Sequence, residues 1–174
     1  MSDFGTVDLV EYEEMDTFSL EFFDYAEKEA QDLAEFNETL QDPTTDNGAQ
    51  WMAEEEFRTL YNFIRRFNHT YKSFACEMRI SVTTFVEEDQ EEELLETFGK
   101  LLHNSLRRSD IIMRRANDFY LLLPDLSEQN KLSVLSRIRR NLQKAGLYSA
   151  VDMSVDSIII GPDREYETWY RVAV

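Results

Sequence analysis

The sequence contains few of the residue types that mark several common classes of protein. Its 174 residues include one cysteine, five glycines and three prolines. The single cysteine, Cys76, cannot form an internal disulfide, and we expect it to be a small buried apolar side chain. No stretch approaches 18 consecutive uncharged apolar residues, which argues against a membrane-spanning helix. The chain also lacks a P-loop, a dinucleotide-binding fingerprint and the residue constellations typical of Ser/His/Asp or Cys/His catalysis.

Basic residues are almost absent from the first third of the chain. Residues 1–56 contain 18 acidic side chains and one basic side chain, whereas residues 57–174 contain 17 of each. The formal net charge of -17 therefore belongs to the N-terminal segment. This asymmetry predicts an acidic arm, residues 1–50, attached to a neutral globular domain, residues 51–174. Because an acidic arm repels nucleic acid and anionic lipid, we expect a protein partner, and neither a nucleic-acid nor a membrane partner.

Apolar side chains recur at helical spacing within the acidic arm. The spacing predicts an amphipathic helix over residues 17–40, with Phe18, Phe22 and Leu33 on its apolar stripe. This stripe must pack either on the globular domain or on the same helix of a second subunit, so a homodimer is one expectation. Residues 41–50 combine proline, glycine, asparagine and aspartate, which predicts a linker. The acidic N-terminus does not resemble an export signal, and we expect a cytoplasmic protein.

The remaining sequence predicts an α+β domain. Helical periodicity indicates helices over residues 51–74, about 91–106 and 127–145. Alternating or β-branched stretches predict strands over residues 76–85, 110–114, 119–123 and 151–160, and the tail from 164 to 174 is a candidate edge strand. The first helix is expected to bury Phe57, Leu60, Tyr61, Ile64, Phe67, Tyr71 and Phe74. This order predicts one mostly antiparallel sheet with helices packed on one or both faces.

The sequence gives no sign of a metal site. Residues 87–93 (EEDQEEE) open the second helix of the domain, where negative charge favours the N-terminal end of the helix dipole. Adjacent residues point around a helix and cannot converge on one ion. His69 and His103 lie far apart in the sequence and have no other ligand at a suitable spacing. We therefore expect neither a metal nor another cofactor.

Several stretches together resemble the GGDEF domains of diguanylate cyclases, which join two GTP molecules into cyclic di-GMP. Residues 106–112 (LRRSDII) are similar to the run LRxSDxV that leads into the family's signature hairpin, and Arg114 stands where an arginine precedes the signature. Residues 119–125 (FYLLLPD) are similar to the strand that follows it, and residues 153–157 resemble the family's late strand. The resemblance covers about residues 57–160. It implies the nucleotidyl-cyclase-like fold of that family.

The chain departs from the family where the resemblance implies substrate and metal binding. Two glycines of the family signature let the backbone approach a triphosphate, because a Cβ would block it. The corresponding turn here is formed by Arg115, Ala116, Asn117, Asp118 and Phe119. Asp118 is the one acidic residue left there, and the first-strand carboxylates are replaced by hydroxyls in residues 81–85 (SVTTF). Mg²⁺ requires anionic oxygens, and the guanine-reading segment is also shortened. The departures imply a catalytically inactive GGDEF-like regulatory or protein-interaction module in bacterial signalling.

One motif of the family is retained. Arg107 and Asp110 fit the RxxD inhibitory site, at which active members bind cyclic di-GMP. An arginine can contact phosphate or the guanine edge, and an aspartate can accept hydrogen bonds from guanine N1 and N2. A cyclic di-GMP receptor is therefore an alternative function, and a binder of another nucleotide in the former active-site cleft is a second alternative. Further arginines that could join such a site are Arg65, Arg66, Arg137, Arg139 and Arg140.

Overall fold

The computed structural model describes residue 28 and residues 30–38, 47–163 and 169–172. The chain divides into two compact units, Met1–Thr45 and Asp46–Val174. In the first unit residues 30–38 are helical, within the helix predicted for the arm, and Leu33 is exposed. Phe18 and Phe22 lie outside the described residues, so their role in packing stays a prediction.

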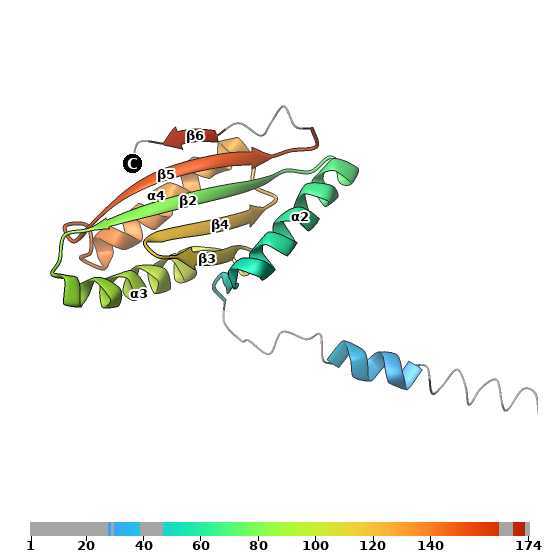
Figure 1. Ribbon diagram of the computed structural model, residues 1–174. Coiled ribbons are helices and arrows are strands. Elements are labelled where there is room, and N and C mark those ends of the chain that lie inside the picture. Colours follow the sequence, from blue (N-terminus) through green and yellow to red (C-terminus); the bar gives the residue numbers. More distant parts are fainter. Residues whose placement is uncertain (1–27, 29, 39–46, 164–168, 173–174) are drawn as a thin grey trace, which may run out of the picture. The chain divides into compact units, whose positions relative to one another are not determined.

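The second unit is built on a six-stranded sheet in the order β1-β3-β4-β2-β5-β6 (Figure 1). The strands are β1 (Gln50–Trp51), β2 (Ala75–Thr84), β3 (Ile111–Arg115), β4 (Asp118–Pro124), β5 (Val151–Ile160) and β6 (Trp169–Val172). The pairing of β1 with β3 is parallel, and the other described pairings are antiparallel. The prediction of a mostly antiparallel α+β sheet with a C-terminal edge strand is confirmed.

Helices cover both faces of this sheet. Helix α2 (Glu54–Tyr71) lies on one face, and α3 (Glu88–Ser105) and α4 (Glu128–Lys144) lie on the other (Figure 1). Side chains alternate along each strand. In β2, for example, Cys76, Met78 and Ile80 are buried in the larger core beneath α3 and α4. Ala75 packs instead in the smaller core beneath α2. Among the described residues no helix is long and apolar enough to cross a membrane.

The start of the domain differs from the prediction. The sequence predicts Trp51 in a helix, but Gln50 N donates to Asp110 O (2.8 Å) and Met52 N donates to Ile112 O (2.9 Å), so this segment is extended beside β3. The end of the predicted linker is also packed. A Cβ added at Gly48 would lie 2.3 Å from Nε2 of His103, and one added at Gly99 would lie 3.1 Å from the Trp51 ring. Gly48 in this segment and Gly99 in α3 therefore allow the segment to pack closely against α3.

The predicted buried stripe of α2 is wrong at its C-terminal end. Phe57 is buried, but Phe67 and Tyr71 are 42% and 68% exposed. Asn68 takes the inward position, where its Nδ2 donates to Ile160 O (2.8 Å) and its Oδ1 accepts from Ser73 Oγ (2.8 Å). The polar contacts of Asn68 hold the end of α2 on β5, so the neighbouring aromatic side chains turn outward.

Candidate functional site

The tip of the β3–β4 hairpin is a tight turn with an unusual backbone. Arg115 and Asp118 pair across it, and Ala116 and Asn117 form the turn itself. Ala116 has a φ of 54°, in the left-handed region that glycine adopts freely. For a residue with a Cβ this conformation costs roughly 1 kcal/mol. The turn therefore keeps a glycine-like backbone while it presents a side chain.

Arg114 ties this hairpin to the beginning of α3. Its Nη1 and Nη2 donate to the two carboxylate oxygens of Glu92, at 2.7 and 2.8 Å, and its Nε donates to Ala116 O at 2.8 Å. The guanidinium also lies over the ring of Phe119, 5.7 Å from its centroid. The hydrogen bond from Arg114 holds the pKa of Glu92 below its ordinary value. A bidentate pair of this kind fixes the orientation of the arginine.

A second set of contacts holds the turn through Asn117. Its Nδ2 donates to Glu91 Oε1 at 2.8 Å, and the same oxygen accepts from Thr84 Oγ1 at 3.0 Å. The backbone N–H of Val82 donates to Asn117 O at 3.0 Å. We call Thr84, Glu91, Glu92, Arg114 and Asn117 the hairpin clamp. The clamp thus fixes the turn against the beginning of α3 through the side chains of Glu91 and Glu92.

The other turn residues provide no metal site. Phe119 is fully buried and packs on Phe98, with ring centroids 5.2 Å apart. Asp118 is half-buried and pairs with Ser81 of β2, which supplies a hydroxyl and no second carboxylate. Within the described part of the chain, no group of three or more His, Cys, Asp or Glu side chains could hold a metal ion.

The two residues of the RxxD motif differ in their exposure to solvent. Arg107 is exposed, but Asp110 is only 4% exposed. Asp110 Oδ2 accepts from the backbone N–H of Arg107 at 2.7 Å, and the backbone N–H of Asp110 donates to Arg107 O at 2.9 Å. Burial raises the pKa of Asp110, while the hydrogen bond from Arg107 and the charges of Arg107 and Arg137 oppose this effect. Asp110 thus closes a turn and faces inward.

Of the five additional arginines, Arg137 comes near Asp110. Its charge acts on the Asp110 carboxyl, and its Nε and Nη2 are buried without a hydrogen-bond partner among the described residues. Arg139 lines a separate hollow with Phe85, and Arg140 is exposed on α4. The remaining two, Arg65 and Arg66, belong to α2, on the opposite face of the sheet from α4.

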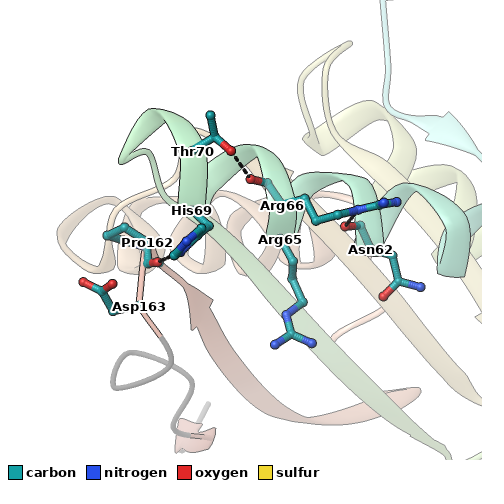
Figure 2. Close-up of a pocket in the computed structure, with 8 residues that line it drawn as sticks. Asn62, Arg65, Arg66, His69, Thr70, Pro162 and Asp163 are labelled. Atoms are coloured by element: carbon teal, nitrogen blue, oxygen red, sulfur yellow. Dashed lines mark hydrogen bonds between the residues drawn. The ribbon is translucent and has the colours of Figure 1, made fainter.

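Arg65 and Arg66 line a pocket of about 740 Å³. Figure 2 shows the two side chains leaving α2 in different directions, with Arg66 lying along the helix toward Asn62. The Nε of Arg66 donates to Asn62 O at 3.3 Å, and His69 Nδ1 lies 2.7 Å from Pro162 O. The pocket is basic, but it does not bring these arginines to Arg107 or Asp110.

An exposed row of aromatic side chains runs along α2. Phe63, Phe67 and Tyr71 follow one another at intervals of four residues, with ring centroids 6.0 and 4.5 Å apart. We call these three residues the aromatic ridge. Sequence reasoning placed Phe67 and Tyr71 in the core, although the i, i+4, i+8 spacing of the three rings is itself visible in the sequence. Large exposed apolar patches on soluble domains commonly mark interaction surfaces.

Comparisons with known proteins identify the fold. A DGC protein from Thermotoga maritima superposes with a TM-score of 0.56 at 16% identity, over 67% of this chain and 89% of that one. The diguanylate cyclase SiaD from Pseudomonas aeruginosa, crystallised in complex with its activator SiaC, superposes with a TM-score of 0.53 at 17% identity. That match covers 94% of this chain and 64% of SiaD. No protein-family model and no curated protein matches the sequence.

The second unit therefore has the fold of the diguanylate cyclases. The resemblance to GGDEF domains predicted from the sequence is confirmed at the level of the fold. At such low identity the likeness concerns architecture.

Proposed function

We propose that this protein is a catalytically inactive GGDEF-like module that acts in bacterial signalling through protein contacts. The observation that carries the proposal is the hairpin clamp, in which Glu91 and Glu92 bind the turn through Asn117 and Arg114. In the GGDEF family the corresponding turn admits a triphosphate through two glycines. Here the turn carries the side chains of Ala116 and Asn117 and is held against α3 by the clamp, which favours loss of GTP binding.

Loss of metal binding would follow from a different set of residues. Ser81 and Thr83 stand on β2 where the family resemblance implies carboxylates, and their hydroxyls do not neutralise Mg²⁺. Asp118 alone could not hold two metal ions. Phosphoryl transfer depends on positioning and on neutralisation of charge, so either loss alone would strongly reduce the reaction.

Calorimetric titration with GTP and Mg²⁺ tests the loss of substrate binding. An active diguanylate cyclase measured in the same buffer is the positive control. We expect no saturable heat from this protein. Saturable GTP binding that disappears when Asp118 is replaced by asparagine would contradict the proposal, because it would place a functional metal or phosphate site at the hairpin.

The aromatic ridge supports a role in protein contacts. Phe63, Phe67 and Tyr71 expose large apolar surfaces on one helix. The similar protein SiaD was crystallised with a protein activator, SiaC. For this chain we propose that the ridge contacts a protein partner or a second copy. The acidic arm is a further proposed contact element. The cytoplasmic location stays a prediction from the sequence.

Light scattering of the full chain separates these contact elements. A homodimer formed through the ridge should dissociate when Phe67 and Tyr71 are both replaced by serine, whereas Phe85→Ser serves as a control at an exposed phenylalanine outside α2. Deletion of residues 1–45 tests the arm by the same measurement. If all variants keep the molar mass of a wild-type dimer, both elements are excluded as its interface.

A cyclic di-GMP receptor is the second candidate function. The exposed guanidinium of Arg107 and the nearby Arg137 favour it, whereas the inward position of Asp110 argues against guanine contact through that carboxylate. Calorimetry with cyclic di-GMP on wild type, Arg107→Ala and the neighbouring control Arg108→Ala would decide it. Absence of binding to wild type removes this candidate. A different nucleotide in the former cleft also stays a prediction, for which a thermal-shift screen is the test.

A further inference from the structure

A second pocket lies between α2 and the sheet, away from the arginines of Figure 2. Its volume is about 350 Å³, within the usual range for small-ligand sites. Strands β2, β3 and β4 contribute to its floor, and the first half of α2 forms its wall. The lining residues are Glu54, Phe57, Arg58, Tyr61, Glu77, Met113, Arg115 and Tyr120. We call it the sheet-face pocket.

Glu77 is the unusual residue of this pocket. It is half-buried, and no described residue donates a hydrogen bond to its carboxyl group. Burial raises its pKa to about 7, and the charge of Arg79 opposes this effect. Arg79 is itself engaged in an ion pair with Asp156 of β5. Carboxyl groups in pockets whose pKa is raised by burial are frequent at functional sites.

Aromatic and apolar side chains surround this carboxyl. In the sheet register Glu77 pairs with Leu122 of β4, so Tyr120 lies diagonally beside it on the same face. The ring of Tyr120 meets that of Phe57 edge-on, with centroids 6.5 Å apart. Tyr61 and Met113 complete these walls. A flat or aliphatic ligand segment could therefore lie between α2 and the sheet.

Arg115 provides the opposite charge. It is exposed at the end of β3, and its guanidinium forms no ion pair with a described residue, whereas Arg58 forms an ion pair with Glu54 on α2. Leu122 of β4 pairs with Glu77 on one side and with Ile111 of β3 on the other, so Glu77 and Ile111 are level and two strands apart. Arg115 lies four residues further along β3. These offsets correspond to about 10 Å across the sheet and about 13 Å along it. Side chains that stand up from the sheet at these two positions would leave room for one small molecule between them.

We propose that the sheet-face pocket binds a small zwitterionic ligand, with its cationic nitrogen at Glu77, its anionic group at Arg115 and an apolar or aromatic spacer between them. This inference does not depend on the proposed loss of cyclase activity, because none of the hairpin-clamp residues lines the pocket.

The proposed ligand would couple its binding to ionisation of Glu77. A cationic nitrogen favours the charged carboxylate, so the affinity should rise as pH increases through 7 and then level off. Charged and titratable groups that face Glu77 come from every adjoining element. They are Glu54, Arg58 and Tyr61 of α2, Arg79 of β2, Arg115 of β3, Tyr120 of β4 and Asp156 of β5.

Three related probes test the proposal on the full chain. The first, 4-(aminomethyl)benzoate, carries both charges on an aromatic spacer, benzylamine lacks the anion, and 4-methylbenzoate lacks the cation. We expect saturable binding of the zwitterion, measured by calorimetry or by amide shifts in nuclear magnetic resonance spectra. Benzylamine and 4-methylbenzoate should each bind at least about tenfold more weakly, since each loses one charge-assisted contact.

Matched variants assign the two charges. Glu77→Gln keeps the shape of the side chain. It should abolish both the tenfold preference for the zwitterion over 4-methylbenzoate and the rise of the zwitterion's affinity with pH. Arg115→Ala should remove the preference for the zwitterion over benzylamine, and Arg108→Ala should leave all three affinities unchanged. Circular dichroism checks that each variant is folded. If no zwitterion binds to wild type at millimolar concentration, or if Glu77→Gln binds with the same pH dependence, the proposal is wrong.

Discussion

Replacing Glu77 by glutamine should change how the stability of the protein depends on pH. Burial raises the pKa of Glu77 from 4.5 to about 7 in the folded chain. The folded state therefore holds this proton more tightly than the unfolded state. Its contribution to the free energy of unfolding is fully present below pH 4.5, decreases as pH rises, and is lost above pH 7. A shift of this size corresponds to a loss of at most about 3 kcal/mol.

Glutamine cannot ionise, so the Glu77→Gln variant should escape this loss. Urea unfolding between pH 4.5 and 8.5, followed by circular dichroism, gives the free energy of unfolding at each pH. The difference between variant and wild type should grow by about 2–3 kcal/mol over this range in favour of the variant. Glu93→Gln, at an exposed position on α3, is the control and should show no such growth. Parallel curves for wild type and Glu77→Gln would refute the argument that burial raises the pKa of Glu77 in the folded chain.

Three other predictions concern the hairpin and the loop before it. Ala116→Gly should raise the free energy of unfolding by about 0.5–1 kcal/mol in urea titrations, because Ala116 has a φ of 54°. An unchanged or lower free energy of unfolding in Ala116→Gly would contradict a left-handed backbone at Ala116. Arg114→Ala should accelerate hydrogen exchange of the Val82 amide, which bonds to Asn117 O, relative to an Arg108→Ala control. Unchanged exchange would show that the clamp does not hold the turn. Asp110→Ala should lower the free energy of unfolding by about 1–3 kcal/mol, since it leaves the N–H of Arg107 without its acceptor, and a neutral result would contradict a structural role for Asp110.

The regular elements of the domain were predictable because their periodicity is strong. Leu95, Phe98 and Leu102 follow the helical repeat of α3, and all three are buried. The hairpin was predictable from two apolar strands separated by a short polar turn. Strand β1 was not, because its two residues gain their conformation only by pairing with β3, 61 residues later in the chain.

The contacts that define the candidate sites could not be predicted from the periodicity of the sequence. The hairpin clamp joins side chains more than twenty residues apart, and the burial of Asp110 depends on how a loop turns between α3 and β3. For α2 the helical repeat predicted one buried stripe that included Phe67 and Tyr71. Asn68 takes the inward position through its bond to Ile160 O, so the aromatic ridge lies outside. The sequence signals of this arrangement were a polar residue inside an apolar repeat and the i, i+4, i+8 spacing of the three rings.

The production of cyclic di-GMP from GTP and Mg²⁺ by the purified protein tests the central proposal most directly. The reaction should be followed by chromatography, with an active diguanylate cyclase as the positive control. We predict no product above the rate of a blank without protein. Turnover at a rate comparable with ordinary cyclases would contradict the proposal that this fold has lost its catalytic function.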